Sequence, residues 1–426
     1  MSVLTRSLVV GLVLLASTAH GQEPAPTPEP QPVPVPPPST IVEPTPPTPA
    51  PEPETPPAVF EVPSVDVHGF VSQGALVTNH NDYLGHSKRG SLEFTEAAVN
   101  FSTEPVERLR VGAQLFTRDL GAVGDYKMTL DWAYIDYRHN PWLGFRAGRV
   151  KLPFGLYNEY SDVDSARLPI LLPQGIYPIL SRDVLLAQTG FEIYGSPSLG
   201  ALGGLDYRLY YGTWFIDPDI GAGGGSPYTI VSVDTERVAG FQVFVRPPIE
   251  NLRVGASLVY SIIHFNLSVA GPMGDIKFVA SLDPVYLWVA SAEYIYDDWQ
   301  FSAEYSRWIQ EIKSSPELIP SSRTDSERAY AMVTRRLKDD LEVGAYYSLH
   351  FADVNDREGT NVKYGDFHER AWQKDLAATV RYDVNDSWLW KLEGHFMDGA
   401  ADLTAGDNPF PKRYWLLFLI KTTVSF

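Results

Sequence analysis

The sequence predicts an all-β fold, a transmembrane antiparallel β-barrel of about 16 strands preceded by a disordered proline-rich segment. Three observations support this prediction. The chain ends on an alternating strand with aromatic residues at both ends of one face, and its N-terminus has the pattern of a secretory signal. Alternating segments with short turns fill residues 65–426.

The last strand carries the clearest pattern. Counted back from the C-terminus in steps of two, one face consists of Phe426, Val424, Thr422, Ile420, Phe418, Leu416 and Tyr414. A period of two is that of a β-strand. From Tyr414 to Phe426 such a strand rises roughly 40 Å at ~3.3 Å per residue, or about 28 Å in height at a tilt of ~45°. This height fits the lipid-facing band of a barrel between its aromatic girdles, although a single strand also fits an ordinary soluble sheet.

Residues 1–21 have the pattern of a secretory signal peptide. Arg6 precedes the short apolar run LVVGLVLLAS, and Ala19 and Gly21 are small residues of the kind that a signal peptidase recognises. The run is too short for a transmembrane helix, which needs ~20 apolar residues. If the exported chain lies in a membrane, it must therefore span it as a barrel. We expect the bacterial outer membrane of a Gram-negative cell.

Composition excludes several classes of protein. The chain has no cysteine, which excludes a disulfide scaffold and a thiolate catalyst. Aromatic residues make up 12% of the chain, yet the mean hydropathy is only −0.14, as in a barrel whose strands turn every second residue toward water. The net charge of −18 argues against a nucleic-acid partner.

Residues 22–64 form a proline-rich segment that we expect to be an extended periplasmic linker. About half of the 35 prolines lie in it, and such sequences favour polyproline II over helix or sheet. One interpretation is a tether toward the cell wall or a periplasmic partner. The other, which we favour because no binding module precedes the segment, is a tail that only delays the first strand.

The barrel prediction for residues 65–426 rests on hairpins. Two clear ones turn at Asp297-Asp298 and after Asn385-Asp386. The fragments LRVGA, LRVGA and LEVGA begin at Leu109, Leu252 and Leu341, each after a turn-like stretch. We interpret them as returning strands with an inward charge at the second position, although they also fit ordinary strand openings.

One long segment, residues 148–195, breaks the alternating pattern. It holds Pro153, Pro169, Pro173 and Pro178, too many for central strands, and it is longer than an ordinary connection. We expect it to fold inward and narrow the lumen. The predicted pore constriction consists of Arg149, Lys151, Arg167, Arg182, Glu159, Asp162 and Asp164.

The run AYIDYRHNPWLGFRAGRVKLPFGLYNE, Ala133 to Glu159, resembles outer-membrane porins of the phosphate-selective (O/P) family. In that family a strand ends in a Gly-Arg-x-x-x-Pro-Phe-Gly element that leads into the pore-narrowing loop. The first strand, VHGFVSQGAL, and the terminal Phe426 are similar to porins at large. The resemblance implies a passive pore, a homotrimer in outer-membrane lipid, and recognition of Phe426 by the barrel assembly machinery. The proline-rich segment departs from the family's plain barrel.

Charge selectivity is not decided by the sequence. Rings of Arg or Lys favour anions and rings of Asp or Glu favour cations, and a phosphate path needs a series of guanidinium groups. The candidate inward arginines are Arg110, Arg146, Arg208, Arg253 and Arg381. Acidic residues also lie on predicted strands, namely Asp131, Asp136, Glu293, Glu304 and Glu342. Anion or phosphate preference is therefore one of two open alternatives.

The sequence favours an outer-membrane porin for passive diffusion of small hydrophilic solutes or ions. The alternative is a structural anchor held to the cell wall or a partner through the proline-rich segment. We expect no enzyme, because the chain has neither a Gly-x-Ser-x-Gly elbow nor a His-Glu-x-x-His helix. We also expect no metal, since in the acidic stretch DVNDREG Arg357 stands where a Ca²⁺ loop needs an oxygen ligand. We expect no cofactor, because passive transport needs none.

Overall fold

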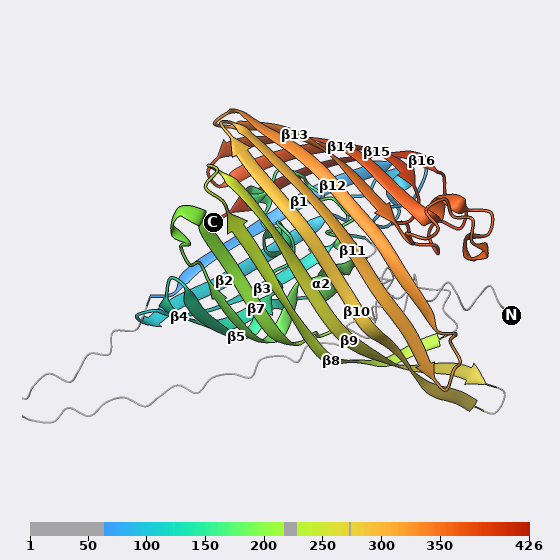
Figure 1. The fold of residues 1–426 in the computed structure, drawn as a ribbon. Coiled ribbons are helices and arrows are strands. Elements are labelled where there is room, and N and C mark those ends of the chain that lie inside the picture. Colours follow the sequence, from blue (N-terminus) through green and yellow to red (C-terminus); the bar gives the residue numbers. More distant parts are fainter. Residues whose placement is uncertain (1–63, 122, 217–227, 272–273) are drawn as a thin grey trace, which may run out of the picture. The chain divides into compact units, whose positions relative to one another are not determined.

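The computed structural model describes residues 64–426 except 122, 217–227 and 272–273. Across these residues sixteen antiparallel strands close into one barrel, and each strand pairs with its neighbours in sequence (Figure 1). The first strand, β1 (Asp66–Thr78), pairs with the last, β16 (Tyr414–Ser425). The predicted fold class is thus confirmed. The predicted signal peptide and the proline-rich segment up to residue 63 lie outside the described residues.

The other elements follow the chain around the barrel. The strands are β2 (Thr95–Val106), β3 (Leu109–Asp119), β4 (Thr129–Asn140), β5 (Leu143–Lys151), β6 (Ala187–Gly195), β7 (Gly204–Thr213), β8 (Tyr228–Arg246), β9 (Leu252–Gly271), β10 (Gly274–Tyr296), β11 (Trp299–Ser315), β12 (Ser322–Lys338), β13 (Leu341–Phe351), β14 (Trp372–Asn385) and β15 (Trp388–Gly399). The helical segments are η1 (Ser87–Arg89), η2 (Asn158–Tyr160), η3 (Asp164–Ala166), η4 (Ile179–Ser181), α2 (Arg182–Leu185), η5 (Gly200–Leu202), η7 (Val362–Tyr364) and η8 (His368–Ala371). In the described part of the chain, no helix is long and apolar enough to cross a membrane.

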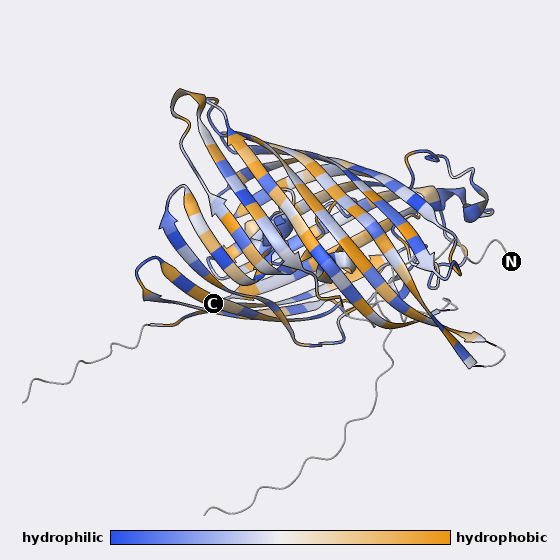
Figure 2. Ribbon diagram, turned by 60° about the horizontal axis from the view of Figure 1, so that its bottom comes forward, coloured by the Kyte–Doolittle hydropathy of each residue, from blue (hydrophilic) through white to orange (hydrophobic). Residues whose placement is uncertain are grey.

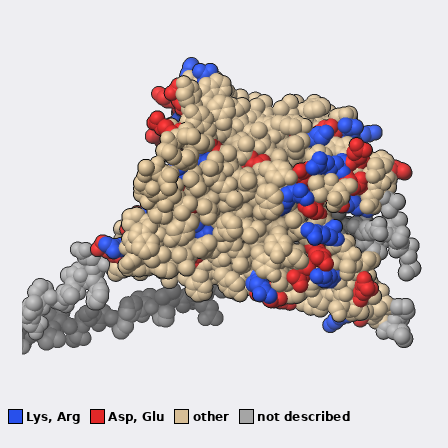
Figure 3. Space-filling model, in the orientation of Figure 1, with Lys and Arg blue, Asp and Glu red and all other residues tan. Residues whose placement is uncertain are grey.

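The strand alternation predicted for the C-terminus is present in β16. Phe418, Ile420 and Val424 are exposed on the outer face, at 53%, 41% and 48%, whereas Leu417 and Leu419 are buried on the inner face. Figure 2 shows the same alternation of hydrophobic and hydrophilic residues along the other strands. On the face drawn in Figure 3, charged side chains gather near the two ends of the barrel and leave the middle almost uncharged.

The barrel has a low wall, formed by strands β1–β7, and a tall wall, formed by strands β8–β11. Strands β1–β7 have between 9 and 13 residues, whereas β8, β9 and β10 have 19, 20 and 23. The register between β9 and β10 shifts between Leu282 and Val285. Just below this shift the outward rings of Tyr260 and Tyr286 lie 5.2 Å apart. From Tyr286 to Tyr296 the strand covers roughly 33 Å at ~3.3 Å per residue, about 23 Å in height at a tilt of ~45°, which matches a lipid-facing band.

Above the register shift the outer face of the tall wall is polar and its inner face is apolar. On the outer face His264 Nδ1 lies 2.8 Å from Ser281 Oγ, and Asn266 Nδ2 donates to Asp234 Oδ2 at 2.7 Å. On the inner face Phe265 and Leu267 are buried in the apolar core. A polar outer face does not fit a lipid environment, so this part of the wall projects beyond the band into water.

Candidate functional site: the loop across the lumen

The connection between β5 and β6, residues 152–186, enters the barrel. It lies inside the predicted segment 148–195, whose two ends belong to β5 and β6. The neck is closed by the backbone, because Leu152 N donates to Leu186 O at 2.9 Å. Asn158 Nδ2 reinforces it by donating to Leu152 O at 2.9 Å and Leu185 O at 2.8 Å. The loop therefore leaves the wall and returns at one point.

The first turn of the loop packs on the tall wall through Glu304 of β11. Leu156 N donates to Glu304 Oε1 at 2.9 Å, and the hydroxyl of Tyr177 donates to Oε2 of the same carboxylate. The turn passes through Gly155, which has a φ of +60°, and a Cβ there would lie 2.3 Å from the Tyr177 hydroxyl oxygen. Only glycine fits this position without displacement.

The part of the loop from Ile170 to Gly175 is held by two later strands of the barrel, β12 and β15. The carboxylate of Glu393 on β15 accepts from Ile170 N at 2.7 Å and from Leu171 N at 2.8 Å. Arg328 of β12 donates to Gly175 O at 2.7 Å. These groups satisfy buried backbone donors and acceptors that a loop away from water would otherwise leave unpaired.

A first ion cluster joins the loop to its own neck. Arg182 Nε lies 2.6 Å from Asp162 Oδ1, and Lys151 Nζ lies 3.1 Å from Asp162 Oδ2. Arg182 Nη2 also reaches Asp131 Oδ2 of β4 at 2.6 Å. Burial alone would raise the pKa of Asp162, but the charges of Arg182 and Lys151 outweigh it and hold that pKa well below its usual range.

A second ion cluster joins the loop to the last strands. Asp164 Oδ2 lies 2.7 Å from Lys421 Nζ of β16 and accepts from Thr423 Oγ1 at 2.7 Å. Its Oδ1 lies 3.7 Å from Lys391 Nζ and 3.1 Å from Arg167 Nη2. The pKa of Asp164 is likewise lowered, since these cations outweigh the opposing effect of burial. The Asp164 carboxylate of the loop therefore lies against basic residues of the last strands, which we call the basic wall.

The basic wall arises from strand register. Arg381 pairs across the sheet with Lys391, and Lys391 pairs with Lys421, so three cations of β14–β16 stand in one row. A row on the other side alternates in charge, with Arg146 Nε 2.9 Å from Asp136 Oδ2 and Arg146 Nη1 2.9 Å from Glu192 Oε1. Direct cross-strand neighbours are close enough to interact in this way.

The structure brings most of the residues predicted for the constriction into contact. Lys151, Asp162 and Arg182 form the first cluster, and Asp164 and Arg167 belong to the second. Glu159 pairs with Arg208 of β7. Arg149 remains within β5, where its Nε donates to the backbone oxygens of Leu130 at 2.9 Å and Asp131 at 3.0 Å.

The sequence analysis missed the strand residues that hold the loop. Glu393, Arg328, Lys391 and Lys421 are each at most 7% exposed, and all bond to loop atoms or loop carboxylates. Their signal was present as charged residues at lumen-facing positions of alternating strands. Which loop atom each would meet depends on contacts between segments far apart in sequence, which periodicity does not encode.

The loop covers the part of the lumen wall that lies at the same level in the barrel as the loop. Lumen-facing residues of widely separated strands, including Ser72, Gln114, Gln188 and Ser306, are at most 7% exposed. The open part of the lumen wall lies toward the short turns, where Arg110, Arg138 and Arg336 are exposed. At the height of the loop, the Asp164 carboxylate and the row of cations are buried against each other, so these charges hold the loop to the wall.

Comparison with known proteins supports the fold. No family model matches the sequence, and no curated protein matches it. The structure is similar to OmpT, an outer-membrane protein of Vibrio cholerae, with a TM-score of 0.54 at 14% identity over 85% of this chain and 98% of that chain. It is similar to an anion-selective porin from Comamonas acidovorans, with a TM-score of 0.53 at 12% identity over 86% and 100% of the two chains.

A further similar structure is the outer-membrane channel DcaP of Acinetobacter baumannii, with a TM-score of 0.50 at 13% identity over 85% of this chain and 97% of that chain. The chain therefore has the sixteen-strand fold of outer-membrane porins. At these identities the likeness establishes the fold alone, and the phosphate-selective family that the sequence resembles stays a prediction.

Proposed function

We propose that this chain is an outer-membrane porin through which small hydrophilic solutes and ions diffuse passively. The observation that carries the proposal is the loop of residues 152–186, which sets Asp164 against Lys391 and Lys421 inside a barrel of porin fold. A barrel of this size with a polar interior provides an aqueous path, and a loop held across the lumen narrows that path. Diffusion of this kind breaks no bond and needs no cofactor.

The proposal includes a preference for anions. Toward the short turns, the exposed lumen-side charges include Arg110, Arg138 and Arg336. The acidic neighbours Asp136 and Glu342 are more buried, with side chains 13% and 17% exposed. These exposed guanidinium groups support the preference, because guanidinium groups match phosphate oxygens.

A reversal-potential measurement on the purified full chain in a planar bilayer tests both parts. Current through the membrane supports the porin, and a shift of the reversal potential toward the chloride value in a KCl gradient supports the anion preference. Replacing Arg110, Arg138 and Arg336 with Gln should remove that preference. Replacing Arg89 and Lys412, exposed cations of the opposite loops, should leave it unchanged.

The same measurement separates the porin from the structural anchor. A silent membrane would overturn the porin and favour the anchor, for which the proline-rich segment would serve as the periplasmic tether. Against the anchor, a barrel of eight strands already spans a membrane, and an anchor has no use for a charged loop across its lumen. Deleting residues 23–63 should therefore leave the conductance unchanged.

We also propose that the chain forms a homotrimer through its low wall. Along the short strands the apolar side chains of Leu92 between β1 and β2, Met128 before β4 and Phe191 on β6 are 75%, 67% and 68% exposed. Gln73 lies on the outward face among them, where its Nε2 donates to Leu92 O at 2.7 Å. Polar groups and loop side chains at this height are better covered by protein than by lipid. A trimer form of OmpT from Vibrio cholerae has a similar fold, with a TM-score of 0.52.

The terminal residue fits the proposed role as an assembly signal. Phe426 N donates to Gly69 O and Gly69 N donates to Phe426 O, both at 3.0 Å. The ring is 66% exposed and crosses Gly69, where a Cβ would lie 2.6 Å from it. Phe426 therefore ends the seam between the first and last strands and remains accessible to a factor that recognises it.

A further inference from the structure

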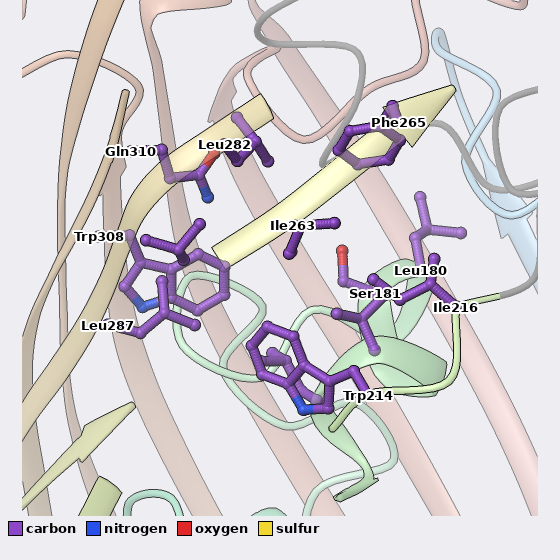
Figure 4. A pocket seen from close by; sticks show the side chains of 13 residues that line it. Leu180, Ser181, Trp214, Ile216, Ile263, Phe265, Leu282, Leu287, Trp308 and Gln310 are labelled. Carbon is purple, nitrogen blue, oxygen red and sulfur yellow. The ribbon is translucent and has the colours of Figure 1, made fainter. Parts of the chain in front are cut away.

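An apolar pocket lies between the loop and the tall wall, at and above the edge of the lipid-facing band (Figure 4). The loop contributes residues of η4 and α2, the end of β7 leads into Trp214 and Ile216, and β9, β10 and β11 supply the rest. About 680 Å³ of space that no atom fills lies among and beside these side chains, and this figure includes open solvent.

The lining is apolar because the inner face of the tall wall is apolar above the register shift. Above the register shift the outer face bears polar groups and the inner face bears Ile263, Phe265 and Leu282. Trp308 and Trp214 add two aromatic rings, which Figure 4 shows on neighbouring sides of the pocket. The lining contains no Lys, Arg, Asp or Glu among the described residues, so an ionic ligand would lose its hydration without compensation.

Two polar groups in this lining have no hydrogen-bond partner among the residues that the structure describes. The Trp214 indole Nε1 is buried and has no hydrogen-bond partner among the described residues. Gln310 is 9% exposed, and its amide makes no hydrogen bond with the described part of the chain. Figure 4 shows the Gln310 amide turned toward the apolar side chains across the pocket. Buried polar groups are usually satisfied, so a ligand group at this place would complete the site.

We propose that this pocket binds a small neutral aromatic compound that carries a hydroxyl group. The ring would pack against Trp308, Ile263 and Leu287, which are among the lining residues. A hydroxyl both donates and accepts, as the donor and acceptor atoms of the Gln310 amide require. The site differs in chemistry from the charged clusters below it, and binding does not depend on whether the barrel conducts.

Calorimetry on the full chain in lipid nanodiscs, with 4-bromophenol as the probe, tests the site. The probe also partitions into lipid, but that signal does not saturate and is common to all variants. Wild type should show one saturable site per chain. Ile263→Trp, which fills the pocket, should weaken it at least tenfold, and Leu258→Trp, on the opposite face of the same strand, should not. Equal binding by wild type and Ile263→Trp would overturn the proposal.

A matched probe tests the role of the hydroxyl. Bromobenzene has the same ring and halogen without the polar group, so wild type should bind it roughly tenfold more weakly than 4-bromophenol. Gln310→Leu should abolish this difference, and equal affinities in wild type would overturn the assigned chemistry. Anomalous scattering from crystals grown with 4-bromophenol supplies an independent measurement. A bromine peak between Trp308 and Ile263 is expected, and a peak elsewhere alone contradicts the site.

Discussion

Lys421 of the last strand lies with its Nζ 2.7 Å from Oδ2 of Asp164 in the loop between β5 and β6. Lys391 and Arg167 approach the same carboxylate from other directions, and the side chains are at most 7% exposed. Asp164 therefore compensates the buried charges of Lys391 and Arg167, and it shares Lys421 with the buried carboxylate of Glu96. Removing one partner of a buried ion pair is costly, about 3–5 kcal/mol, because the other charge stays desolvated.

Asp164→Asn should loosen the loop. The substitution leaves Lys421 and Lys391 beside a neutral amide, so we expect backbone amides of residues 160–172 to exchange hydrogen at least tenfold faster, with the strands unaffected. Hydrogen exchange followed by mass spectrometry measures this. Asp366→Asn, at an exposed aspartate outside the barrel wall, is the matched control. Equal exchange in the two variants would show that the ion cluster does not hold the loop.

Gly155→Ala should destabilise the loop more than Gly365→Ala. Both glycines have a left-handed φ, +60° and +58°, but an alanine Cβ at 155 would meet the Tyr177 hydroxyl at 2.3 Å, whereas nothing lies within 4 Å at 365. The backbone term is about 1 kcal/mol at either site, and overpacking adds about 1–3 kcal/mol at 155. Urea unfolding monitored by the gel mobility of the folded barrel compares the two variants. Equal losses would contradict the packing described for Gly155.

The pH dependence of conductance should follow the two loop carboxylates. Neighbouring cations hold the pKa values of Asp162 and Asp164 well below the usual range, against the effect of burial. Lowered folded-state pKa values stabilise the loop fully above the ordinary aspartate pKa of about 4, and this stabilisation is lost as pH falls toward the folded values. Conductance should therefore stay constant from about pH 8 to pH 5 and rise below about pH 4. A rise near neutral pH would point to other groups.

Cysteine labelling should locate the membrane band on the tall wall. The chain has no cysteine of its own, so each single substitution reports one position. On intact cells an impermeant maleimide should label Lys277→Cys above the register shift but not Ala290→Cys within the band. Asp386→Cys, in a short turn, should react only after the outer membrane is permeabilised. The reverse pattern for Lys277→Cys and Asp386→Cys would invert the orientation.

Val71→Trp should break the proposed trimer. Val71 is 55% exposed on the outer face of the low wall, where a bulkier ring would separate two packed copies. Native mass spectrometry should show trimers for wild type and for Leu258→Trp on the tall wall, and monomers for Val71→Trp. A trimer that survives Val71→Trp would place the contact elsewhere, and a monomeric wild type would refute the trimer.

The strands were predictable because their signal is local. The fragments beginning at Leu109, Leu252 and Leu341 open β3, β9 and β13, and the turn predicted at Asp297-Asp298 lies between β10 and β11. The alternation in β16 fixes which residues face outward, since side chains on a strand alternate between two faces.

The anchoring of the loop was not predictable in the same way. Proline content and length marked the segment, but the contacts of Glu393 with Ile170 and Leu171 join residues whose separation in sequence carries no periodic signal. Arg149 illustrates the limit, because spacing alone did not distinguish a strand arginine bonded to backbone oxygens from the loop cations. The polar outer face and apolar inner face of the tall wall above the register shift were also not predicted, since a register shift alters the alternation that strand prediction assumes.

Single-channel conductance of the full chain, compared with a variant whose residues 160–178 are replaced by a short Gly-Ser linker, measures whether the loop limits flow through the barrel. The variant keeps Asn158 and the closed neck but loses the part that crosses the lumen. If the loop limits flow through a porin, the variant should conduct several-fold more current than wild type and lose its acid-dependent rise. Equal conductance in the two proteins would show that the loop does not limit flow, and no current through either would contradict the porin.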